Sequence, residues 1–72
     1  MQVYKIEYFF NYGGGIYLLL ASSLVSAILF VEKQKEKATN LSIGYCELIN
    51  NLQYTKPVTE EVTVITSFEF EE

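Results

Sequence analysis

Residues 16–31 read IYLLLASSLVSAILFV and carry no charged side chain. A helix that crosses a bilayer needs about 20 apolar residues, so this run is short for a membrane span. The run reaches that length only if it is extended back to Tyr8, which places Asn11 and three consecutive glycines inside the helix. Each glycine costs about 1 kcal/mol relative to alanine in a helix interior. We therefore interpret the run as a strand followed by a helix, with a membrane span over Tyr8–Val31 as the alternative.

The two parts of the run meet at Ser22 and Ser23. Ile16–Ala21 is apolar at every position, which is typical of a strand covered on both faces. A serine side chain accepts a hydrogen bond from the first turn of a helix, so this pair predicts a helix start. We expect the helix over Ser23–Lys37, followed by Asn40 as a left-handed cap residue. Its apolar stripe, with a 3.6-residue period, consists of Leu24, Ala27, Ile28 and Val31.

The residues before the run predict the first hairpin. Met1–Phe10 alternates aromatic or β-branched residues with others at a period of two, which indicates a half-buried strand. Asn11–Gly15 contains three glycines, which adopt positive φ without steric cost. We therefore predict a turn over Asn11–Gly15 that joins two antiparallel strands.

The residues after the helix predict two more strands. Leu41–Tyr54 alternates with a phase change, which indicates a β-bulge near Tyr45 and Cys46. A turn at Asn50 and Asn51 would instead divide this segment into two strands. Val58–Phe70 is the fourth predicted strand. Its apolar face is expected to carry Val58, Val62, Val64, Phe68 and Phe70, and its polar face Thr59, Glu61, Thr63, Ser67 and Glu69.

These elements predict an α+β fold of order β-β-α-β-β. The simplest architecture is a four-stranded antiparallel sheet with one helix packed on one face. A chain of 72 residues is expected to form a single domain over residues 1–72. Half of its residues are hydrophobic, which is rich for a monomer of this size and favours a homo-oligomer or a tight protein partner.

The composition excludes several classes of chemistry. The chain has no His and no Asp, so a Ser-His-Asp triad is excluded. One cysteine and scattered glutamates do not supply a zinc site, and we expect no metal, no other cofactor and no enzymatic activity. Cys46 has no activating base near it in sequence and is interpreted as a buried strand residue. The net charge of −4 without a basic stripe argues against nucleic-acid binding.

The remaining hypothesis is a small protein-interaction module that self-associates, as a dimer, through an apolar surface of the sheet or helix. Two alternatives stay open: an acidic inhibitor that occupies a basic site on a larger protein, and the membrane microprotein. The inhibitor would use Glu60, Glu61, Glu69, Glu71 and Glu72. Because the N-terminus has no signal-like pattern, we expect a cytoplasmic protein. The candidate contact residues are Tyr4, Tyr8, Tyr12 and Tyr17 on the first hairpin, and Val25, Leu29 and Phe30 on the helix.

Overall fold

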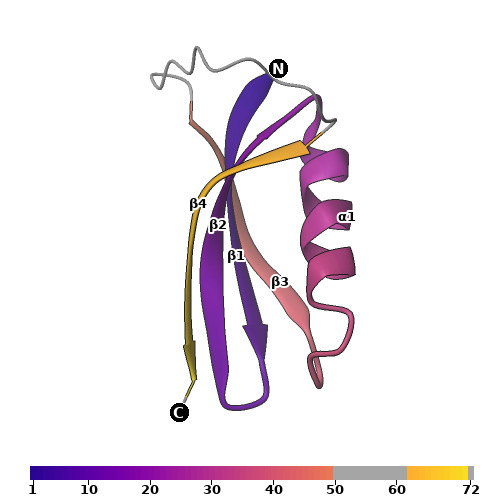
Figure 1. Cartoon of the computed structure of the whole chain (residues 1–72), viewed down its shortest axis with the longest axis vertical. Helices are drawn as coiled ribbons and strands as arrows, with labels where there is room; N and C mark the ends of the chain where they lie inside the picture. The colour runs from indigo at the N-terminus through magenta and orange to yellow at the C-terminus, as the bar shows by residue number, and fades with distance from the viewer. Residues whose placement is uncertain (50–61, 72) are drawn as a thin grey trace.

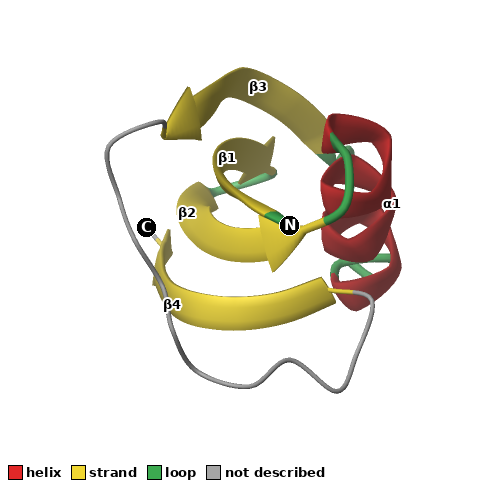
Figure 2. Cartoon of the chain, turned by 90° about the horizontal axis from the view of Figure 1, so that it is seen from above, coloured by secondary structure: helices red, strands yellow, loops and turns green. Residues whose placement is uncertain are grey.

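The computed structural model describes residues 1–49 and 62–71. These residues form five elements: β1 (Gln2–Phe10), β2 (Gly13–Ala21), α1 (Leu24–Gln34), β3 (Ser42–Ile49) and β4 (Val62–Glu71). The strands make one antiparallel sheet of order β3-β1-β2-β4, and α1 runs along one side of it (Figures 1 and 2). The predicted α+β class, with one helix on one face of a four-stranded antiparallel sheet, is confirmed.

The first hairpin is present, but its turn is shorter than predicted. Asn11 and Tyr12 alone form the turn, and the three glycines belong to β2. Tyr12 takes the positive φ that the tight turn requires, at 68°, whereas no glycine among the described residues has a positive φ. The prediction of a turn over Asn11–Gly15 was therefore wrong, because these glycines are needed for close packing rather than for backbone conformation.

The helix begins where the sequence predicted and ends earlier. Ser23 is the N-cap, and its side chain accepts a hydrogen bond of 3.1 Å from the backbone N–H of Ser26. The last helical residue is Gln34 rather than Lys37, and Lys35 is the C-cap. Asn40 has the expected left-handed conformation, with φ of 58°, but it lies beyond the helix end. Its side-chain amide donates a 3.1 Å hydrogen bond to Asn11, which ties the α1–β3 connection to the hairpin turn.

The core lies between α1 and the face of the sheet that we call the inner face. Alternate residues of β1 and β2 point towards the helix because side chains in a strand alternate between faces. The cross-strand pairs Tyr4–Leu19 and Ile6–Tyr17 therefore lie on the same face. The buried cluster comprises Tyr4, Ile6, Tyr8, Tyr17, Leu19, Ala21, Ala27, Val31 and Val62.

Both outer strands carry a register shift. In β3, Ile6 pairs with Cys46 while Tyr8 pairs with Ile43, so two residues of β3 stand opposite Glu7. This shift confirms the bulge that the phase change predicted near Tyr45 and Cys46. The choice between one bulged strand and two strands depends on Asn50 and Asn51, which lie outside the described residues.

The shift in β4 was not predicted, and it changes which residues share a face. Leu18 pairs with Thr66 and Leu19 pairs with Val64, so Ile65 is an extra residue in β4. Before this point the alternation holds, and Val62 and Val64 are on the inner face. After it the alternation is reversed: Glu69 is on the inner face, while Phe68 and Phe70 are on the face turned away from α1, which we call the outer face. The predicted single apolar face was therefore wrong. Val58–Glu61 of the predicted strand lie outside the described residues.

The Tyr8–Val31 span of the membrane alternative is not one helix. It is divided among the end of β1, the hairpin turn, β2 and most of α1. Within residues 1–49 and 62–71, no helix is both long enough and apolar enough to cross a membrane.

Candidate functional site

Three residues form a row across the inner face at the hairpin end of the sheet. Gly15 of β2 pairs with Tyr8 of β1 on one side and with Glu69 of β4 on the other. A Cβ atom at Gly15 would lie 2.5 Å from the Tyr8 hydroxyl and would also collide with the carbonyl of Phe68. Gly15 therefore leaves the space through which the ring of Tyr8 passes over β2 and reaches β4.

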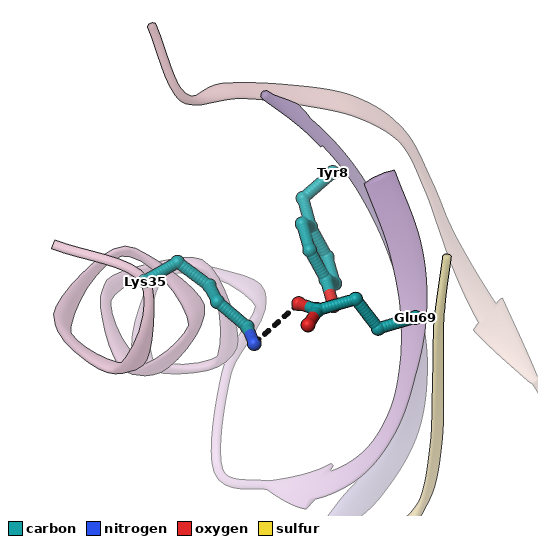
Figure 3. A network of polar contacts seen from close by, with 3 residues as sticks. All are labelled: Tyr8, Lys35 and Glu69. Atoms are coloured by element: carbon teal, nitrogen blue, oxygen red, sulfur yellow. Dashed lines mark hydrogen bonds and ion pairs between the residues drawn. The ribbon is translucent and has the colours of Figure 1, made fainter. Parts of the chain in front are cut away.

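Glu69 receives two polar contacts at this point (Figure 3). The Tyr8 hydroxyl donates a hydrogen bond of 2.8 Å to Glu69 Oε1, and Lys35 Nζ lies 2.5 Å from the same oxygen. Lys35 Nζ also lies 5.5 Å from the centre of the Tyr8 ring and 6.0 Å from that of Tyr17, within the range of a cation–π interaction. This network joins β1, β4 and the C-terminal end of α1.

The network shifts all three pKa values away from neutrality. Burial, then the hydrogen bond to Glu69, raises the pKa of Tyr8 well above its ordinary value of 10.0. The contact with Glu69 raises the pKa of Lys35, while the contact with Lys35, followed by that with Tyr8, lowers the pKa of Glu69. At neutral pH the phenol is thus protonated, the ammonium is charged and the carboxylate is ionised. The network has one protonation state across the physiological range and suits a structural role better than proton transfer.

A hollow of about 620 Å³ lies beside the network, between the hairpin turn, the end of α1 and the end of β4. Its charged lining consists of Lys33, Lys35, Lys37, Glu36, Glu69 and Glu71. Lysines and glutamates occur in equal number, so the hollow favours neither an anion nor a cation. In the part of the chain that the structure describes, no three His, Cys, Asp or Glu side chains are grouped so as to hold a metal ion.

The outer face carries an apolar surface at the same end of the sheet. We call Phe9 of β1 and Phe68 and Phe70 of β4 the phenylalanine surface; these side chains are 47%, 64% and 44% exposed. The ring centres of Phe68 and Phe70 lie 6.4 Å apart. The rings surround a shallow hollow of about 150 Å³, which Ile16 and Glu7 also line. Further along the outer face, Val3 and Leu20 are buried.

The structure separates the predicted contact residues into two groups. Tyr4, Tyr8 and Tyr17 are buried beneath α1, and Phe30 is partly buried against the ring of Tyr17. These four residues therefore pack in or against the core. The alternation of β1 and β2 turns the three tyrosines towards the helix. The other three are exposed, Tyr12 at the hairpin turn and Val25 and Leu29 on the side of α1 away from the sheet.

Sequence reasoning missed Phe9, Phe68 and Phe70 as a group. The pattern of the last strand singled out Phe68 and Phe70 as apolar, but assigned them to the same face as Val62 and Val64. Only the extra residue Ile65 separates the two pairs.

Cys46 is partly buried on β3, and its burial, followed by the charge of Glu7, raises the pKa of its thiol. The thiol is therefore protonated at neutral pH.

Comparisons with protein-family models, curated proteins and solved structures found no match to this chain.

Proposed function

We propose that this chain is a small non-enzymatic protein-interaction module that self-associates through the phenylalanine surface. The observation that carries the proposal is the exposure of Phe9, Phe68 and Phe70 together on one face at one end of the sheet. The phenylalanine ring has no polar group that can form a hydrogen bond with water. Burial of a cluster of exposed rings against a partner therefore lowers the free energy of the system.

The size of the surface sets the expected affinity. A fully exposed aromatic side chain presents about 200 Å², so the three rings together present about 300 Å². This is about the size of the largest apolar patch on a typical monomer, which is often functional. A stable interface buries about 800 Å² on each partner, so the rings supply the centre of an interface and not all of it. We expect a dissociation constant in the micromolar range, because area alone does not offset the entropy lost on association.

A second copy of the chain is the partner that we propose. Closed symmetric dimers are the most common oligomers, and a two-fold axis places the same patch of each copy in contact. Aromatic surfaces are self-complementary, because rings of one copy pack against rings of the other in offset or edge-to-face geometry. The high hydrophobic content of the chain also supports burial of further surface by association.

Light scattering across a range of protein concentrations tests the proposal. The expected result is a mass that rises from monomer to dimer, and that stays monomeric in Phe68→Ser and Phe70→Ser over the same range. Val25→Ser and Leu29→Ser are matched controls, because these apolar side chains are at least about as exposed as Phe68 and Phe70 but lie on α1. If the helix variants abolish association and the phenylalanine variants do not, the surface is the outer side of α1. A wild-type chain that stays monomeric at every concentration overturns the proposal.

The two alternatives receive less support. The inhibitor would need the C-terminal glutamates to act together, but Glu69 is turned to the inner face and paired with Lys35. Glu60, Glu61 and Glu72 lie outside the described residues. The membrane alternative required a single span over Tyr8–Val31, which is divided between two strands and a helix. The absence of a nucleic-acid partner and a cytoplasmic location stay predictions from the sequence.

A further inference from the structure

Among the described residues the sheet has two edge strands, and they differ in regularity. The strand order places β3 at one edge and β4 at the other. The bulge opposite Glu7 interrupts β3 near its middle. In β4 the extra residue Ile65 lies in the first half, and Thr66–Glu71 then pairs with β2 without a break. Thr66–Glu71 of β4 is therefore the longest stretch without a bulge on either edge of the sheet.

Edge strands usually carry features that prevent another strand from adding to them, such as lysine, proline, a β-bulge or an inward-pointing charge. Thr66–Glu71 has no lysine and no proline, and its two charged residues are Glu69 and Glu71. The charge of Glu69 points inward but is paired with Lys35. The bulge at Ile65 lies before this stretch and Glu71 lies at its end, so neither interrupts the edge over Thr66–Phe70.

We propose that β4 of a second copy adds to this edge in antiparallel orientation, with Phe68 of each copy opposite Phe68 of the other. This inference rests on the proposed function, since it specifies how the two copies meet. The product is a continuous eight-stranded sheet with both helices on the same side. The ladder covers Thr66–Phe70 of each copy, and its main-chain hydrogen bonds supply the contact that the phenylalanine rings alone lack.

Charge excludes some of the registers that symmetry allows. Residues directly opposite each other in an antiparallel pair share a face. The two-fold axis must therefore lie midway between a residue of β4 and the same residue of the second copy, and the axis is named below by that residue. An axis at Glu69 places Glu69 opposite itself, and an axis at Phe70 places Glu69 opposite Glu71, both of which are unfavourable. An axis at Phe68 places Glu69 opposite Ser67 and Phe70 opposite Thr66, so no two acids oppose each other.

The same register places the most exposed ring of the phenylalanine surface beside the same ring of the second copy. Phe68, at 64% exposure, gains an aromatic partner directly across the new strand pair. Phe70 lies two residues away on the same face. It is within reach of its diagonal neighbour across the new strand pair, which is Phe68 of the second copy. An axis at Ser67 also avoids opposing acids, but it places Phe68 opposite Thr66 and forms no aromatic pair across the axis. The geometry therefore favours Phe68.

Hydrogen exchange on the wild-type chain, measured amide by amide by NMR, tests the edge. At concentrations well above the dissociation constant, the outward amides of Thr66–Phe70 are expected to exchange about tenfold more slowly than in dilute protein. The outward amides of β3 are the internal control and should not change. If light scattering shows a dimer but the β4 amides exchange equally at both concentrations, the edge pairing is overturned and the proposed function stands. If no dimer forms at any concentration, both are overturned.

Disulfide trapping tests the register. In a Cys46→Ala background, an equimolar mixture of Ser67→Cys and Glu69→Cys chains is expected to form a mixed disulfide dimer under mild oxidation, because an axis at Phe68 places these two positions opposite each other while the Phe68 ring is kept. Ser67→Cys alone is the matched control, since it would crosslink with itself only if the axis passed through Ser67. Preferential crosslinking of the Ser67 variant overturns the Phe68 register.

Discussion

The hydroxyl of Tyr8 lies 2.8 Å from Oε1 of Glu69, although the two residues are 61 positions apart and two strands apart in the sheet. β2 lies between them, and the contact is possible because the β2 residue in that row is Gly15. The extra residue Ile65 turns Glu69 to the inner face, and the end of α1 brings Lys35 to the same oxygen. The Tyr8–Glu69 contact thus depends on two distant features of the chain, Gly15 and the extra residue Ile65, and Lys35 adds a second contact to the same carboxylate.

Replacement of Tyr8 by phenylalanine is expected to reduce the free energy of unfolding by about 1–2 kcal/mol, since it removes a part-buried hydrogen bond from the Tyr8 hydroxyl to a charged group. The ring itself still fills its place in the core. Urea denaturation followed by circular dichroism measures the change. Tyr12→Phe removes a hydroxyl from an exposed ring at the turn and should leave stability unchanged. Equal losses in the two variants would show that the Tyr8–Glu69 hydrogen bond contributes nothing measurable.

The contribution of Glu69 is expected to depend on pH. Its pKa is lowered in the folded state, mainly by Lys35 and then by Tyr8, so its stabilising effect is present above its ordinary pKa of 4.5. The effect is lost as the pH falls through the lower folded value. Because the ion pair is partly exposed, Glu69→Gln should cost less than about 1 kcal/mol at pH 7.

Urea midpoints of wild type and Glu69→Gln between pH 7 and pH 2 test this dependence. The difference between the two proteins should shrink towards the acid end. Glu71→Gln, which removes a charge two residues along the same strand, is the matched control and should keep most of the acid sensitivity of wild type. A wild-type advantage over Glu69→Gln that is constant with pH would contradict the depressed pKa.

Gly15→Ala is expected to destabilise the fold by about 1–3 kcal/mol, the range for overpacked sites. The new methyl group would meet the Tyr8 hydroxyl and the Phe68 carbonyl, and the carbonyl belongs to backbone that is held by strand pairing. Thermal unfolding measures the loss. Gly44→Ala is the control, because its methyl group would meet the end of the Phe9 ring, which can rotate away. A larger loss at Gly44 than at Gly15 would show that the row across β2 is not tightly packed.

Ser23→Ala is expected to cost about 1 kcal/mol, the usual value for loss of an N-cap. The Ser23 side chain accepts from the Ser26 N–H and also donates a 3.1 Å hydrogen bond to the Ser26 hydroxyl. Ser22→Ala, one residue earlier and exposed, should have little effect. Urea denaturation of the two variants decides between the serines, and a greater loss from Ser22→Ala would mean that the cap is assigned to the wrong residue.

Local patterns predicted the elements well and their ends less well. Alternation located the strands, and the serine pair located the helix start, because these signals depend on neighbouring residues only. The early end of α1 at Gln34 and the short turn at Tyr12 were missed. Charged residues at a helix end give no sharp stop signal, and glycine permits several conformations. Tyr4, Tyr8 and Tyr17, three of the four tyrosines proposed for contact, are buried because the sequence does not state which face of a strand the helix covers.

The sequence by itself determined the element order, the class of the fold and the absence of histidine and aspartate chemistry, since these depend on composition and short-range periodicity. The tertiary structure alone decided which side chains are exposed together. The pairing of Leu18 with Thr66 and of Leu19 with Val64 makes Ile65 an extra residue, and this register exists only between strands that are distant in the chain. A one-residue shift reverses every following side chain. It therefore brings Glu69 to Lys35 on the inner face and leaves Phe68 and Phe70 exposed on the outer face.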